Sequence, residues 1–232
     1  MIKFEGNKIE KIYLGESKIK KIYLGSDLIY RYIPERYRIV SGIKNSSSTK
    51  VPTSIKLDST NWEIETVFTA TSGTLGSFYY LQSRATSSAG IYGISGSTST
   101  GGISIGCGGV GAATGQNIFR AFGNKYYIKG GLNDTTVSIY IKNITTAQEE
   151  NRSNQLTSNY INPTIPLTLF GGWNTNNLNS GYICHYLKIK KNGEIVLEYI
   201  PAIDTQRSNK AGFYNTVNNT FVTESQGGLT AV

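Results

Sequence analysis

Residues 186–200 read YLKIKKNGEIVLEYI, and this stretch decides the fold class. Two runs of alternating apolar and polar residues flank Asn192-Gly193, a dipeptide typical of the tight turn between two antiparallel strands. A second turn, Val217-Asn218-Asn219, separates the last two runs of this kind. The C-terminal part of the chain is therefore predicted to consist of β-hairpins.

The same pattern extends back through the chain. Short runs rich in Ile, Val, Tyr and Phe alternate with turn residues, and no segment has a convincing amphipathic helical period. The 232 residues include 26 Gly and 16 Tyr but only one Met and one His, a composition typical of strands and turns. The result is a predicted all-β sandwich or jelly roll. Its clear strands are 37–40, 54–57, 62–70, 77–83, 125–128, 136–141, 164–170, 182–190, 195–200, 212–216 and 220–222.

The first thirty-odd residues differ, because the phrase K-I-x-K-I-Y-L-G occurs there twice, at 8–15 and 18–25. Gly-containing loops separate β-rich runs, which predicts a meander of three or four strands or, alternatively, three rungs of a small solenoid. Pro34 interrupts the pattern. We therefore assign residues 1–34 to an N-terminal β-repeat segment and 35–232 to a separate domain.

The repeat places aliphatic residues on one strand face and Tyr and Lys on the other. So small a sheet buries little surface alone, so its aliphatic face must be covered. A near-exact repeat favours a contact between copies of the chain or with a larger assembly, and the alternative is docking on its own domain. The residues predicted to mediate oligomerisation or anchoring are Ile12, Leu14, Ile22, Leu24, Tyr13 and Tyr23.

The formal net charge of +8 raises nucleic acid as a partner, but basic and acidic residues are interleaved and no nucleic-acid motif is present. Nucleic acid is therefore not expected to bind, and no membrane insertion is expected because no apolar run is long enough to span a bilayer. A mildly basic surface also fits an acidic polysaccharide or an acidic protein. The N-terminus shows no secretory signal, so Cys107 and Cys184 are expected to be free thiols.

Glu63 and Glu65 lie two residues apart on one face of a predicted strand. Glycoside hydrolysis requires such a pair of carboxylates. An exposed strand face opposite Trp62, Ile64 and Phe68 explains both glutamates without chemistry. No catalytic role is therefore assigned to them.

The other candidate catalytic, metal-binding and phosphate-binding motifs also have structural explanations. His185, the only histidine, adjoins Cys184, but neighbours on a strand point to opposite faces and cannot act as a pair. One His and two Cys do not supply a zinc site, and no run of spaced Asp and Asn forms a calcium loop. The glycine-rich stretch 93–115 lacks the helix and Lys-Ser/Thr of a phosphate loop and is predicted to form a loop or edge strands. No catalytic residue, metal or cofactor is predicted.

The stretch 170–182, FGGWNTNNLNSGY, is the better candidate for binding. An aromatic ring beside amides suits a sugar, because the ring covers the apolar face and the amides bond the hydroxyls. Alternatively, Trp173 fills the edge of the core. A second aromatic pair follows Asn124. The predicted glycan-binding residues are Trp173, Asn174, Asn176, Asn177, Tyr126 and Tyr127.

The last fifty residues also carry a family resemblance. YLKIKKNGEIVLEYIPAID and KAGFYNTVNNTFVT resemble the end of concanavalin A-like (laminin-G-like) jelly-roll domains of bacteriophage structural proteins and related bacterial surface proteins. IVSGIKNSSSTKVPTSIKL resembles their opening strand and loop, and the KIYLG leader resembles short repeats of phage tail and fibre proteins. The resemblance implies a jelly-roll recognition domain displayed on a virion, often for glycans, although the legume-type metal cluster has no match here.

The sequence thus predicts a bacteriophage head or tail fibre or decoration protein without enzymatic activity. It is expected to assemble in the host cytoplasm and to lie on the virion surface. Its expected partners are further copies of itself in a trimer, other virion proteins through the N-terminal segment, and host-surface polysaccharide. Two alternatives remain, a purely structural decoration protein without a ligand and a polysaccharide-degrading enzyme on the same fold.

Overall fold

The computed structural model describes residues 13–14, 17–18, 21–24, 27–31, 33–46, 49–71, 77–83, 92–97, 101–115, 122–171, 181–224 and 228–232. The described residues form strands and turns and contain no helix, which confirms the all-β prediction. None of them builds a helix capable of crossing a membrane. The chain divides into two compact units, Met1–Tyr37 and Arg38–Val232.

The described residues of the N-terminal unit include two antiparallel hairpins. Strand β1 (Tyr13–Leu14) pairs with β2 (Ser17–Lys18), and β3 (Lys21–Leu24) pairs with β4 (Asp27–Arg31). Of the residues predicted to mediate oligomerisation, Tyr13 and Leu14 lie in β1 and Ile22, Tyr23 and Leu24 in β3, whereas Ile12 lies outside the described residues.

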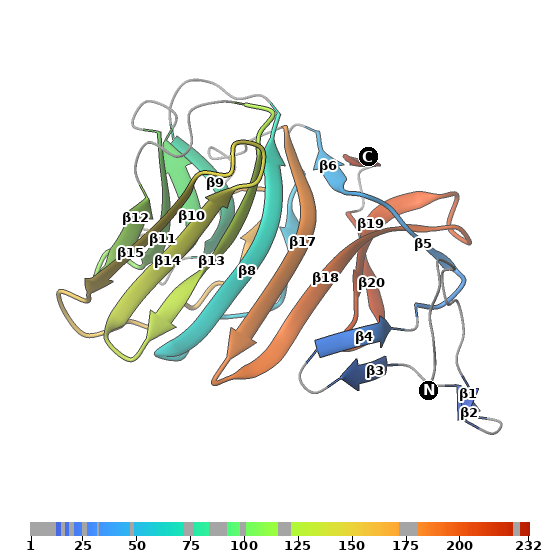
Figure 1. Ribbon diagram of the computed structural model, residues 1–232, viewed down its shortest axis with the longest axis horizontal. Coiled ribbons are helices and arrows are strands. Elements are labelled where there is room, and N and C mark those ends of the chain that lie inside the picture. The colour runs from blue at the N-terminus through green and yellow to red at the C-terminus, as the bar shows by residue number, and fades with distance from the viewer. Residues whose placement is uncertain are drawn as a thin grey trace. The chain divides into compact units, whose positions relative to one another are not determined.

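The larger unit is built from two antiparallel sheets (Figure 1). The smaller has six strands in the order β12-β11-β10-β9-β16-β7. They are β7 (Val51–Pro52), β9 (Ser77–Ser83), β10 (Tyr92–Ser97), β11 (Gly102–Cys107), β12 (Ala112–Gly115) and β16 (Thr168–Leu169).

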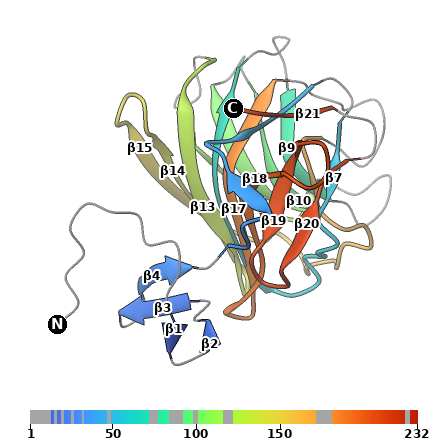
Figure 2. The ribbon, with the colours of Figure 1, turned by 90° about the vertical axis from the view of Figure 1, so that its right-hand side faces the viewer.

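The larger sheet has eleven strands, eight of them in the order β15-β14-β13-β8-β17-β18-β19-β20. Figure 2 shows β15, β14 and β13 side by side at one edge of it. These eight are β8 (Asn61–Ala70), β13 (Lys125–Asn133), β14 (Thr136–Asn143), β15 (Glu149–Gln155), β17 (Tyr182–Lys191), β18 (Glu194–Asp204), β19 (Lys210–Asn215) and β20 (Thr220–Val222). Off this path lie β5 (Tyr37–Ile39), β6 (Ile43–Asn45) and β21 (Leu229–Ala231).

The core lies between the inner faces of the two sheets. Along β8 the side chains of Trp62, Ile64, Thr66 and Phe68 are buried, whereas the alternate residues 63, 65 and 67 are partly exposed. The ring of Phe68 stacks on Tyr80 of the smaller sheet with a centroid distance of 4.4 Å. This aromatic contact joins the two sheets, and the alternation along β8 leaves its other face for polar residues.

The hairpin predicted from Asn192-Gly193 is present between β17 and β18. Both turn residues have positive φ, 50° and 82°, as a type I′ turn requires. In the turn between β19 and β20, the side-chain oxygen of Asn219 accepts a hydrogen bond from the Tyr214 hydroxyl at 2.9 Å. The two turns quoted from the sequence therefore join the strands expected to flank them.

Other strands differ from the prediction. Residues 54–57 are not a strand, because Ser54 adopts a φ of 62° that breaks the extended chain after β7. The expected strand 164–170 shrinks to β16. Strand β15 was not predicted, since its sequence EENRSNQ is polar and all but one of its residues are exposed. The glycine-rich stretch forms β10, β11 and β12, of which β12 is an edge strand as expected.

Candidate functional site

The outer face of the eleven-stranded sheet carries polar side chains in rows that cross the strands. Residues paired across neighbouring strands point to the same side of a sheet. The register aligns one row from β15 to β18, consisting of Asn151, Tyr140, Lys129, Glu65, Lys188 and Glu198. A second row consists of Ser153, Ser138, Gly131, Glu63 and Lys190, and a third of Gln155, Thr136, Asn133 and Asn61.

Glu63 and Glu65 lie on this outer face, as the strand alternation predicted. The Glu63 carboxylate lies 3.4 Å from Lys129 Nζ and 3.3 Å from Lys190 Nζ. Glu65 forms an ion pair with Lys188, which lies directly across from it on β17. Each carboxylate thus has a lysine from a neighbouring strand, and neither carries an uncompensated negative charge.

Two tyrosines complete this polar surface. Tyr127 lies beside Tyr140, with ring centroids 6.0 Å apart. Burial, with the nearby Glu65 carboxylate as a further cause, raises the pKa of Tyr127 to about 12. The Tyr140 hydroxyl donates a hydrogen bond to Glu149 at 2.6 Å. Both phenols therefore stay protonated as hydrogen-bond donors at neutral pH.

Glu198, farther along the first row, is held tightly. Its carboxylate, only 7% exposed as a residue, accepts hydrogen bonds from Tyr186 at 3.1 Å and from Thr216 at 2.5 Å. A buried carboxylate needs such donors to remain stable. These two hydrogen bonds link β17, β18 and the turn after β19, so Glu198 has a structural role.

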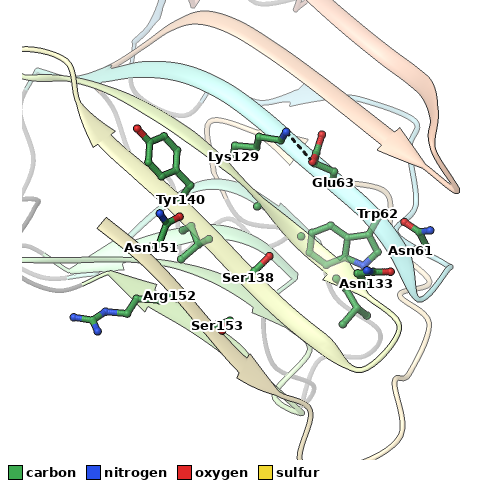
Figure 3. A pocket seen from close by; sticks show the side chains of 14 residues that line it. Asn61, Trp62, Glu63, Lys129, Asn133, Ser138, Tyr140, Asn151, Arg152 and Ser153 are labelled. Atoms are coloured by element: carbon green, nitrogen blue, oxygen red, sulfur yellow. Dashed lines mark ion pairs between the residues drawn. The ribbon is translucent and has the colours of Figure 1, made fainter. Parts of the chain in front are cut away.

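A hollow of about 670 Å³ opens over β8, β13, β14 and β15 (Figure 3). Gly131 lies among its lining residues and has no side chain to fill it. Figure 3 shows Ser138 between Tyr140 and Asn151 at one end and Asn61 and Asn133 at the other. The remaining lining residues are Trp62, Glu63, Lys129, Gly130, Leu132, Ile139, Arg152 and Ser153.

Six of the lining residues carry neutral groups that form hydrogen bonds, namely Asn61, Asn133, Ser138, Tyr140, Asn151 and Ser153. Amides both donate and accept, and hydroxyls do the same with one proton. Asn61, Asn133 and Ser138 are exposed, so water is the partner that a ligand would replace. The hollow therefore suits a polar, uncharged ligand with many hydroxyl groups, while the Tyr140 ring offers a flat apolar surface.

The glycan-binding residues predicted from the sequence are placed differently. Trp173, Asn174, Asn176 and Asn177 lie outside the described residues. Tyr126 is fully buried and packs in the core, 5.7 Å from the Phe68 ring, so its own ring is not presented to a ligand. Tyr127 lies on the outer face beside Tyr140 but does not line the hollow.

Of the residues that line the hollow, Glu63 was considered from the sequence and was assigned no role, and the others were not predicted. Ser138 and Tyr140 occupy the polar positions of a correctly expected strand, and that alternation was the available signal. Asn151 and Ser153 lie on the unpredicted strand β15. Only the register between four strands brings these residues together.

Cys184 and His185 lie on opposite sides of β17, and Cys107 lies on β11 in the core. Cys107 and Cys184 are free, as expected, and both are buried, which raises the pKa of each thiol to about 12. His185 faces the other way, where its Nδ1–H donates to the Ser41 carbonyl at 2.6 Å and its Nε2 accepts from Thr69 Oγ1 at 3.0 Å. Among the described residues, no group of three or more His, Cys, Asp and Glu could hold a metal ion.

His185 predicts a pH dependence of stability. Burial lowers the pKa of His185 below its ordinary value of 6.5, so the folded state binds the proton more weakly than the unfolded state. Its stabilising contribution is therefore present above about pH 6.5 and is lost as the pH falls through the folded pKa. Urea unfolding at pH 8 and pH 5.5 is expected to show a larger loss for the wild type than for His185→Asn. Equal losses in the two proteins would contradict this assignment.

Several solved structures match the chain at low similarity. One is the enzymatically active domain of tailspike protein 2 of bacteriophage CBA120, with a TM-score of 0.48 and 17% identity over 66% of this chain and 26% of that chain. This chain spans about a quarter of that tailspike chain. Others are SCP-B, a peptidase of the eqolisin family (TM-score 0.34, 15% identity), and scytalido-glutamic peptidase (TM-score 0.34, 13% identity), each matched over 84% of this chain and 100% of that chain. No protein-family model and no curated protein matches the chain.

One prediction from the sequence is corrected by this comparison. A protein without enzymatic activity was expected, whereas the tailspike domain is described as enzymatically active and the other two proteins are peptidases. The expectation rested on the lack of a catalytic motif along the chain. Such motifs are a poor guide in a β-sandwich, because side chains that act together on a sheet face come from different strands. At these identities and TM-scores the comparisons assign no activity to this chain.

Proposed function

We propose that this chain is a bacteriophage virion protein that binds host-surface polysaccharide in the hollow on the outer face of its larger sheet. The resemblance of the C-terminal fifty residues and of the KIYLG leader to phage structural proteins supports the virion assignment. The observation that carries the binding assignment is the lining of the hollow, in which amides and hydroxyls surround an unfilled floor at Gly131. Its volume of about 670 Å³ also lies in the range of ligand pockets.

A polysaccharide site requires a surface that bonds hydroxyls and accommodates an extended chain. The hollow reaches from the row of Lys129 to the row of Asn133, four residues along β13, or about 13 Å at the rise of a strand. This length exceeds one sugar ring. The Tyr140 ring at one end would cover the apolar face of a sugar, and the amides at the other end would bond its hydroxyls.

Replacing Ser138 by tryptophan tests the binding site. Ser138 is exposed in the middle of the hollow, so an indole ring there fills the space without disturbing the core. Binding to an array of bacterial surface polysaccharides is expected to weaken at least about ten-fold, equivalent to about 1.4 kcal/mol.

The matched control is Lys142→Trp, on the same strand and face but outside the lining. It is expected to bind like the wild type, and an equal loss in both variants would remove the hollow as the site. Reducing ends measured in the same samples distinguish binding alone from binding with cleavage.

We further propose that the N-terminal unit assembles the chain, as a trimer, and attaches it to other virion proteins at the virion surface after assembly in the host cytoplasm. Several copies of a weak site gain avidity without new contacts. Light scattering of the full chain is expected to report a mass three times that of the 25.4 kDa chain. A monomer that stays monomeric at high concentration would contradict self-assembly and leave attachment to another protein as the role of this unit.

A further inference from the structure

The charge of the whole chain and the charge around the hollow point to different ligands. A formal net charge of +8 favours an acidic polysaccharide by long-range attraction. The hollow, however, lies among rows of side chains whose charges compensate one another. The ligand class is therefore decided by which cations near the hollow are available to bind an anion.

A fourth row, which contains Tyr127, Lys142 and Glu149, lies beside the three described above, and the four rows together carry four lysines and four glutamates. The lysines are Lys129, Lys142, Lys188 and Lys190, and the glutamates are Glu63, Glu65, Glu149 and Glu198. Each lysine has a carboxylate partner, since Lys142 lies 3.7 Å from Glu149 in addition to the three ion pairs of Glu63 and Glu65. The four positive and four negative charges sum to zero.

Arg152 is the remaining cation among the residues that line the hollow. Its guanidinium lies 2.6 Å from Glu150. Figure 3 shows its side chain directed away from Ser138 and the centre of the hollow. Tight recognition of a carboxylate or phosphate requires a guanidinium or ammonium group aimed at it. An anionic sugar would here have to break an existing ion pair and would meet the Glu63 carboxylate at the rim.

We propose that the polysaccharide bound in this hollow is uncharged. This inference rests on the proposed glycan-binding function and narrows it to chains of neutral sugars, recognised through their hydroxyls by Asn61, Asn133, Asn151 and Ser138. The excess positive charge of the chain belongs to residues outside these rows and is not needed for this recognition.

The test uses the full-length protein and two sets of oligosaccharides of matched length. The neutral set contains gluco-, manno- and galacto-oligosaccharides, and the anionic set contains oligogalacturonates and glycerol phosphate oligomers. Binding is measured by calorimetry in low and high salt. The expected result is binding within the neutral set, with an affinity that changes less than about two-fold between 50 mM and 500 mM salt, because screening acts only on charges.

Two variants show whether the oligosaccharides bind in the hollow. Ser138→Trp is expected to abolish the neutral binding, and Lys142→Gln, which removes a cation outside the hollow, is expected to leave it unchanged. Preferential binding of the anionic set with a loss of affinity in high salt, blocked by Ser138→Trp, would overturn the proposal while leaving glycan binding intact. No binding of either set would contradict the proposed function itself, and the inference with it.

Discussion

Replacing Phe68 by alanine is expected to lower the free energy of unfolding by about 3–5 kcal/mol, the largest effect of any single change considered. The Phe68 side chain is fully buried at the centre of the sandwich. Its ring stacks on Tyr80 of the smaller sheet and packs 5.7 Å from Tyr126 on the neighbouring strand. Alanine removes the ring and leaves a cavity between the two sheets, which rigid strands on both sides cannot close.

Urea denaturation followed by tryptophan fluorescence measures this loss. The control is Ile195→Ala, because Ile195 is 45% exposed on β18 and its truncation leaves no cavity. We expect the control to cost less than about 1 kcal/mol. A Phe68→Ala protein as stable as this control would show that the two sheets are not held together at this point.

Replacing Gly131 by alanine is expected to cost about 1–3 kcal/mol although only one methyl group is added. A Cβ atom at Gly131 would lie 1.9 Å from the carbonyl oxygen of Trp62 and 2.9 Å from the Cα atom of Glu63. Both are backbone atoms of β8, so no side-chain rotation relieves the contact. Strands β13 and β8 would have to separate in the middle of the larger sheet.

The same change also alters the hollow, where Gly131 lines the floor. Thermal unfolding and oligosaccharide binding are therefore measured on the same protein, and both are expected to decrease. Ser138→Ala is the control for stability, because Ser138 lies directly opposite Gly131 on β14 and is exposed. An unchanged melting temperature for Gly131→Ala would mean that the two strands are farther apart than described.

Some of this architecture was predictable because its causes are local. Asn192-Gly193 forms a turn through the backbone preferences of two adjacent residues, so the hairpin of β17 and β18 could be placed from the sequence. The alternation along β8 likewise placed Glu63 and Glu65 on the face opposite Trp62. Where the local signal was weak, the prediction was wrong or missing, as for residues 54–57 and for the polar strand β15.

The candidate site depends on causes that are not local. Its residues are separated by up to 92 positions, from Asn61 to Ser153, and lie on four strands. The sequence by itself determined that the chain is all-β, where its clearest hairpins turn and which residues of its best strands face outward. The tertiary structure alone decided which outward residues become neighbours, because the cross-strand register sets Gly131 between Glu63 and Ser138. That register also gave each lysine near the hollow a carboxylate partner, so a chain with a charge of +8 presents a neutral surface there.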